Sequence, residues 1–189
     1  MTLESEDLLQ SILNSLDRID YIRTQDIPDI ELYMDQVTTF MGSRLKNSAR
    51  NPEDDKILTK TMINNYAKND LLPPPSKKKY SREHILLLIF IYYYKGILSI
   101  SDIQTILRPI TERYFHKKED GFCLEDIYNE VFGLEKAEVE FLKKDVAEKF
   151  QKAQGTFSEA PEEDQEFLRT FSFLCMLSFD VYVKKLIIE

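Results

Sequence analysis

Apolar residues recur along most of the chain at three- and four-residue intervals, which is the period of a helix buried on one face. One such stretch covers residues 3–23 and a second covers residues 30–45, with Pro28 between them. Residues 46–55 are polar and contain Pro52, so they are predicted to form a loop. The pattern therefore predicts helices joined by short connections.

The helix predicted over residues 58–68 has two faces of different chemistry. Its apolar face carries Leu58, Met62, Ile63, Tyr66 and Ala67, and its polar face carries Thr61, Asn64, Asn65 and Lys68. Thr59 is the predicted N-cap, and three prolines at 73–75 prevent the helix from continuing. Asparagine is a poor helix former, so Asn64 and Asn65 indicate a role for their amides at the surface.

A basic segment, SKKKYS, follows the prolines at residues 76–81 and is predicted to form the tip and arm of a small β-hairpin. Ser81 then caps an apolar helix that ends at Gly96. Its ten-residue apolar run is shorter than the roughly 18 residues of a membrane span, so we expect a buried helix and no membrane contact. A short helix capped by Ser99 follows over residues 99–110, with Ile103, Ile106 and Leu107 facing the core.

The last third of the chain predicts a short helix over residues 124–134 and a longer one over 135–153. A final helix begins after a Ser158 cap, with Pro161 in its first turn, and reaches Glu189 without a termination signal, which favours a truncated chain. Near one stripe of this helix lie Phe167, Phe171, Leu174, Cys175, Ser178, Val181, Tyr182 and Lys185.

Charge is segregated along the chain. The net charge is -8, yet residues 56–108 hold nine basic and three acidic residues, a net +6. Residues 1–55 and 111–189 each carry a net charge of -7. A basic island between acidic flanks indicates a local anionic partner rather than a generally basic protein.

Several functional classes find no support in the residues. Cys123 and Cys175, and His84 and His116, lack the spacing of metal ligands, so we expect no metal and no disulfide. We find no nucleophile–base pair and no phosphate-binding glycine loop, so we expect neither an enzyme nor a cofactor. The acidic, amphipathic opening does not resemble a signal peptide, which favours a cytoplasmic protein.

The order of helix, helix, basic hairpin, apolar helix and short helix resembles a winged helix-turn-helix of the MerR type. The segments LT at 58–59, MINNY at 62–66, LLP at 71–73, KKKY at 77–80 and ILSISDIQTIL at 97–107 look like the start, core, exit, wing and last helix of that pattern. With ELYMDQV and LTKTMINNY, residues 29–110 also resemble a bacterial family of unknown function that carries such a domain. Asn64-Asn65 replaces the usual Arg-Tyr, the wing lacks glycine, and the first connection is about ten residues instead of three or four.

The sequence thus predicts an all-α protein with a small β-hairpin wing. Residues 1–28 form an N-terminal helix, residues 29–110 a MerR-like winged helix-turn-helix, and residues 111–189 a C-terminal helical domain for dimerisation or ligand sensing. The resemblance implies a transcriptional regulator that binds double-stranded DNA, with a recognition helix in the major groove and the wing on phosphates. The predicted DNA-binding residues are Thr59, Lys60, Thr61, Asn64, Asn65, Tyr66, Lys68, Lys77, Lys78, Lys79, Tyr80 and Arg82.

The sequence leaves open three kinds of partner: a second copy of the chain, a small-molecule effector, and a protein in place of DNA. One such module buries only about 600–1,000 Å² on DNA, so we expect a homodimer through the Phe-rich C-terminal helices. A small-molecule effector bound by the C-terminal third is an alternative reading of its aromatic residues, which core packing explains equally well. The net negative charge of the whole chain, and the loss of the arginine of the usual Arg-Tyr pair, favour a second functional class: a MerR-like module that contacts proteins and no longer binds DNA. A polar helix face is also an ordinary solvated surface.

Overall fold

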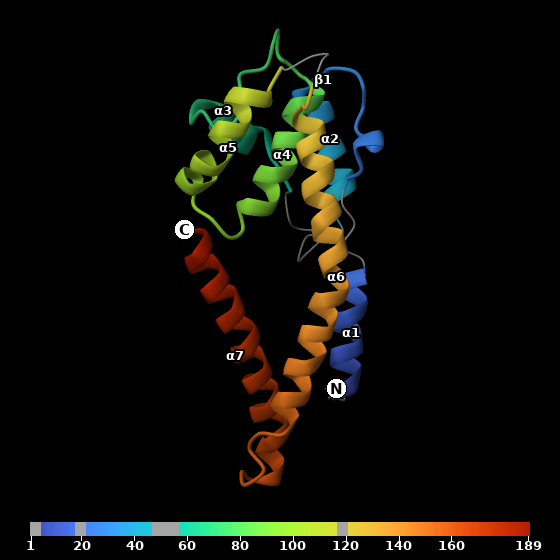
Figure 1. Cartoon of the computed structure of the whole chain (residues 1–189), viewed down its shortest axis with the longest axis vertical. Helices are drawn as coiled ribbons and strands as arrows, with labels where there is room; N and C mark the ends of the chain where they lie inside the picture. Colours follow the sequence, from blue (N-terminus) through green and yellow to red (C-terminus); the bar gives the residue numbers. More distant parts are fainter. Residues whose placement is uncertain (1–4, 18–21, 47–56, 117–120) are drawn as a thin grey trace. The chain divides into compact units, whose positions relative to one another are not determined.

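The structure is a computed structural model that describes residues 5–17, 22–46, 57–116 and 121–189. These residues hold seven α-helices, one 3₁₀ helix and a two-stranded antiparallel sheet (Figure 1). The prediction of a mainly helical protein with a small sheet is confirmed. Two compact units are present: a central unit, residues 21–132, and a terminal unit, residues 1–20 with 133–189. Within the described ranges, no helix combines the length and the apolarity that a membrane crossing needs.

The central unit is built around α4, which lies among α2, α3 and α5 (Figure 1). In chain order its elements are η1 (Thr24–Asp26), β1 (Leu32–Tyr33), α2 (Met34–Leu45), α3 (Lys60–Lys68), β2 (Lys79–Tyr80), α4 (Arg82–Tyr94), α5 (Ile100–Tyr114) and the start of α6 (Leu124–Gln154). Residues 84–91 of α4 are all buried, so the apolar run is the central helix of a packed core, as its length predicted.

The small sheet differs from the predicted hairpin. β2 pairs with β1, with Leu32 opposite Tyr80 and Tyr33 opposite Lys79, whereas the preceding arm contributes a single bridge between Ser76 and Lys79. Leu32 and Tyr80 are both buried, so the long-range pairing brings two large side chains into the core. Because residues 32–33 form a strand, α2 begins at Met34 and not near residue 30.

Most predicted helix starts are confirmed by their hydrogen bonds. The Thr59 hydroxyl oxygen accepts from the Met62 N–H at 3.1 Å, and the Ser99 hydroxyl oxygen accepts from the Asp102 N–H at 3.3 Å. The Ser81 N–H donates to Nδ1 of His84 at 2.9 Å, which closes the first turn of α4. The cap chemistry is local, which is why the sequence alone could predict it.

Helix α5 is longer than predicted, because it continues through Pro109 to Tyr114. A proline inside a helix removes one backbone hydrogen bond and usually ends or bends the helix. Here Ile110 and Tyr114 pack against the central core, and this burial offsets the lost bond.

The terminal unit contains α1 (Ser5–Asp17), the C-terminal part of α6 and α7 (Glu162–Ile188). The rings of Phe150 and Phe173 meet edge to face at 5.4 Å, and Ala153 is buried beside them. Leu9 and Ile12 of α1 pack against the same small cluster. Residues 22 and 23 of the predicted 3–23 stretch are not helical, and its residues 3, 4 and 18–21, like residues 47–55 of the predicted loop, lie outside the described residues.

Two predictions for the terminal unit were wrong in detail. The two helices expected over residues 124–153 are one helix, α6, which passes through Gly133. An interior glycine costs only about 1 kcal/mol relative to alanine, and a run of good helix formers, residues 134–137, follows it. The N-cap of α7 is Pro161 rather than Ser158, whose carbonyl instead accepts from Nε2 of Gln165 at 3.3 Å.

Candidate nucleic-acid interface

Helix α3 is held to the central unit by one face. Ile63 and Tyr66 are buried, and Met62 packs partly against the core. The opposite face, Thr61, Asn64, Asn65 and Lys68, is exposed as predicted. Among the described residues, the side-chain amides of Asn64 and Asn65 have no hydrogen-bond partner, so their donors and acceptors are available to an external ligand.

The end of α3 is fixed by a left-handed residue. Asp70 has a φ of 52°, and the N–H groups of Leu71 and Leu72 return to the Tyr66 carbonyl at 2.9 and 3.3 Å. Leu71 and Leu72 are buried, which anchors the reversed chain. Gln104 of α5 also donates to the Asn69 carbonyl at 3.1 Å, so α5 braces the helix end. The exposed face is therefore presented on a short helix secured at both ends.

The lysine segment forms a tight turn between α3 and α4, in the loop at the top of Figure 1. The Lys79 N–H donates to the Ser76 carbonyl at 2.8 Å, and both central residues, Lys77 and Lys78, have positive φ values of 48° and 65°. This is the pattern of a type I′ turn, which usually takes Asn or Gly at these positions. Lys77 and Lys78 are exposed, while the Lys79 ammonium lies 5.5 Å from the Tyr33 ring centroid.

The predicted phosphate contact Arg82 is instead a structural residue. Its guanidinium makes five hydrogen bonds: Nε and Nη2 donate to Glu125 at 2.9 and 3.0 Å, Nη1 donates to Asp29 at 2.5 Å and to the Ile27 carbonyl at 2.8 Å, and Nη2 donates to the Thr24 carbonyl at 2.6 Å. All its N–H groups are engaged in joining α4 to η1 and α6. We therefore leave Arg82 out of the proposed interface.

Two predicted tyrosines also lie in the interior. Tyr66 and Tyr80 are 6% and 3% exposed, and burial raises the pKa of both phenols. Both sit on the apolar side of their elements, so their side chains face the core and not a ligand. We therefore leave Tyr66 and Tyr80, like Arg82, out of the proposed interface.

Tertiary structure also brings an acid to the polar face. Asp35, in the first turn of α2, forms an ion pair with Lys60 in the first turn of α3. No acidic residue lies between Lys56 and Asn69, so the sequence around Lys60 did not indicate its pairing with the distant Asp35. Of the predicted lysines, Lys68, Lys77 and Lys78 are exposed and have no ion-pair partner within the described part of the chain.

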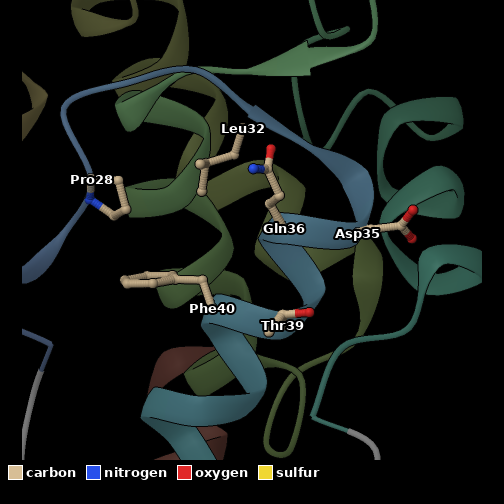
Figure 2. Close-up of a pocket in the computed structure, with 6 residues that line it drawn as sticks. All are labelled: Pro28, Leu32, Asp35, Gln36, Thr39 and Phe40. Atoms are coloured by element: carbon tan, nitrogen blue, oxygen red, sulfur yellow. The ribbon is translucent and has the colours of Figure 1, made fainter.

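A shallow, largely apolar hollow of about 380 Å³ lies beside α2, lined by Pro28, Leu32, Asp35, Gln36, Thr39 and Phe40 (Figure 2). The Asp35 side chain points away from Pro28 and Phe40 in this view, consistent with its pairing to Lys60. The volume is in the range of small-molecule sites. The hollow lies in the central unit, whereas the effector site was expected in the C-terminal third.

Residues 22–131 match the family model described as Domain of unknown function (DUF1836). The chain belongs to this family. The matched range of the DUF1836 domain nearly coincides with the central unit and extends beyond the predicted 29–110 at both ends. It thereby includes Thr24 and Glu125, which hold Arg82. The search of curated proteins and the search of solved structures gave no match.

Proposed function

We propose that the DUF1836 domain of this chain binds double-stranded DNA as a transcriptional regulator, with α3 in the major groove and the 76–79 turn on the phosphate backbone. One observation carries the proposal: α3 is buried on one side and exposes on the other two asparagine amides that have no partner among the described residues. An asparagine amide pairs in a bidentate way with N6 and N7 of adenine, and this contact discriminates by about 1–3 kcal/mol.

Charge supports the same proposal. In a protein of net charge -8, residues 56–108 carry +6, and Lys68, Lys77 and Lys78 are exposed cations within that island. Lysine contacts to phosphates position a protein on DNA without reading its sequence. The turn would therefore contribute affinity, and the α3 amides would contribute discrimination.

The proposal is tested by titrating labelled genomic DNA fragments with the full chain at several salt concentrations. Three neutralised phosphates per copy predict a slope of log K against log salt of about -3 for one copy. Lys77→Glu with Lys78→Glu should abolish binding. The matched control is Lys136→Glu with Lys144→Glu, which makes the same charge change at two exposed lysines of α6 and should leave most binding intact. Absence of binding by the wild-type chain at low salt would overturn the proposal.

A second candidate is a protein-interaction module, the alternative that the sequence left open. The engagement of Arg82 by five hydrogen bonds and the pairing of Lys60 with Asp35 favour it, because both remove cations from the DNA face. A combined Asn64→Ala and Lys78→Ala variant separates the two candidates. It should lose DNA binding under the first, and should keep capture of a protein partner under the second.

A further inference from the structure

Helix α7 carries apolar side chains on two sides, and among the described residues only one of these sides is covered. On the inner side Phe173 is fully buried against Phe150, and Asp180 pairs with Lys149 of α6 at 2.6 Å. The inner side therefore accounts for the packing of α7 within the terminal unit.

The outer side carries a stripe at Phe167, Phe171, Leu174, Ser178, Val181 and Lys185, whose spacings alternate between four and three residues. We call these six residues the outer stripe. Alternating spacings of four and three residues form the heptad seam of a coiled coil, where successive positions meet a second helix. Its four apolar members are 52% to 70% exposed, and the neighbouring Tyr182 is 63% exposed. An exposed stripe that is mostly apolar, as this one is apart from Ser178 and Lys185, marks an interaction site in a folded protein.

The exposed area fits a second copy. On a scale of 150–250 Å² for a large side chain, Phe167, Phe171, Leu174, Val181 and Tyr182 leave roughly 600 Å² in water. A standard interface buries about 800 Å² per partner, so the outer stripe and its margins supply most of what a stable dimer needs. The terminal unit also gains, because its described buried core is limited to Phe150, Ala153 and Phe173.

Charge determines the orientation of the second helix. The first turn of α7 contains Glu162, Glu163 and Asp164, with Glu166 one turn on, and its end contains Lys184 and Lys185. Two parallel copies would place acid beside acid and lysine beside lysine. An antiparallel pair places the acidic start of each helix beside the basic end of the other, although Lys185 also lies 3.5 Å from Glu189 in its own chain.

We propose that the outer stripe of α7 binds a second copy of this chain, with the two α7 helices antiparallel about a two-fold axis that crosses the middle of the stripe. Such an axis makes both halves of the contact identical, as in most homodimers. The proposal concerns assembly, goes beyond the proposed DNA function and stands whether or not the chain binds DNA.

The first test measures the mass of the full chain without DNA by sedimentation equilibrium over a range of concentrations. We expect twice the 22.3 kDa of one chain. Phe171→Ser, on the outer stripe, should give the monomer, with helicity unchanged by circular dichroism. Phe179→Ser is the matched control: it changes the same residue type, 65% exposed on the same helix but off the stripe, and should remain dimeric. A wild-type chain that stays monomeric overturns the proposal, because the outer stripe is then covered by another part of the same chain or by a different protein. A Phe171→Ser variant that remains dimeric also overturns it.

The second test addresses orientation. Glu163→Lys with Glu166→Lys, and separately Lys184→Glu with Lys185→Glu, should each weaken the dimer by about tenfold, since each sets like charges together at both ends of the pair. An equimolar mixture of the two variants should recover dimerisation, because every end then meets an opposite charge. Failure of the mixture to recover overturns the antiparallel arrangement. A DNA titration that fails while these results hold refutes only the proposed DNA function.

Discussion

At the scale of single residues, burial decides whether a basic side chain stabilises the fold or is available to a partner. Arg82 and Lys78 are both basic residues of the same island, yet one is enclosed by five hydrogen bonds and the other projects from a turn. The difference arises because Arg82 opens a buried helix, beside carbonyls and carboxylates from η1, Asp29 and α6. At this scale the structure separates residues that stabilise the DUF1836 domain from residues available to a partner.

Replacement of Arg82 is predicted to lower the stability of the protein. Arg82→Ala should lower the free energy of unfolding by about 3 kcal/mol, since it leaves Glu125 and two carbonyls without their donor. Urea titration followed by circular dichroism measures this loss. Arg108→Ala, at an exposed position of α5, should change the free energy by less than about 0.5 kcal/mol. Equal effects of the two substitutions would show that the Arg82 network contributes little.

The buried His84 predicts a pH dependence of stability. Burial lowers its pKa, the nearby charge of His116 adds to this, and the Pro73 and Pro74 carbonyls and Glu83 oppose it. A histidine with a lowered folded pKa binds fewer protons in the folded state than in the unfolded one. Its stabilisation is therefore complete above the unfolded pKa of about 6.5 and is lost as the pH falls from there toward the folded pKa.

We expect the free energy of unfolding to decline between pH 7 and pH 5 with a slope approaching, at most, about 1.4 kcal/mol per pH unit from this residue. His84→Gln removes the titrating group and keeps an acceptor three residues after Ser81. Its stability should depend less on pH over the same interval, measured by urea titration at each pH. Parallel pH profiles of the two proteins would assign the dependence to other groups.

At the scale of elements, the 76–79 turn and α3 combine local strain with exposed chemistry. Two lysines with positive φ occupy a turn that favours Asn-Gly. Strain of this kind persists where it is compensated by function or by surrounding structure. The anchoring of the turn through β2 and the buried Tyr80 explains how the strain is tolerated.

The strained turn therefore predicts that substitutions which relieve its strain raise the stability of the protein but weaken its binding to DNA. Lys77→Asn with Lys78→Gly should raise the free energy of unfolding by about 1–2 kcal/mol, because both positions then accept positive φ. The same variant should weaken DNA binding, whereas Lys77→Arg with Lys78→Arg should retain it. Thermal unfolding and DNA titration measure the two effects. A stabilised variant with unchanged DNA affinity would remove the turn from the interface.

At the scale of the whole molecule, charge and assembly are linked. The basic island lies within the DUF1836 domain, and the outer stripe lies on α7 of the terminal unit. A single small module binds DNA over a limited area, so two joined copies gain affinity through effective concentration. The two proposals remain separable, because one is measured with DNA and the other without it.

Their combination predicts a specific change in salt dependence. A wild-type dimer that engages both modules should show a log–log slope of about -5 to -6, whereas Phe171→Ser should show about -3, since only one module then binds. Affinity at fixed salt should fall in the same variant. Anisotropy titrations at several salt concentrations provide both values. Identical slopes for the two proteins would mean that one module binds DNA in the dimer.

The sequence by itself determined the features that depend on neighbouring residues. Thr59 and Ser99 cap their helices, the polar face of α3 is exposed, and the apolar run at 85–94 is helical and buried over residues 85–91, because caps and periodicity act within one or two turns. The continuity of α6 through Gly133 and of α5 through Pro109 was missed, since packing outweighed weak local signals for ending a helix.

Only the tertiary structure decided the pairings between distant residues. It placed β2 against β1, Arg82 among Thr24, Asp29 and Glu125, and Lys60 against Asp35. It also turned Tyr66 and Tyr80 inward and left the outer stripe of α7 exposed. Such contacts depend on where the backbone brings side chains that are tens of residues apart, and on which faces the packing covers. Periodicity identifies a face as apolar or polar, but the folded chain determines what that face meets.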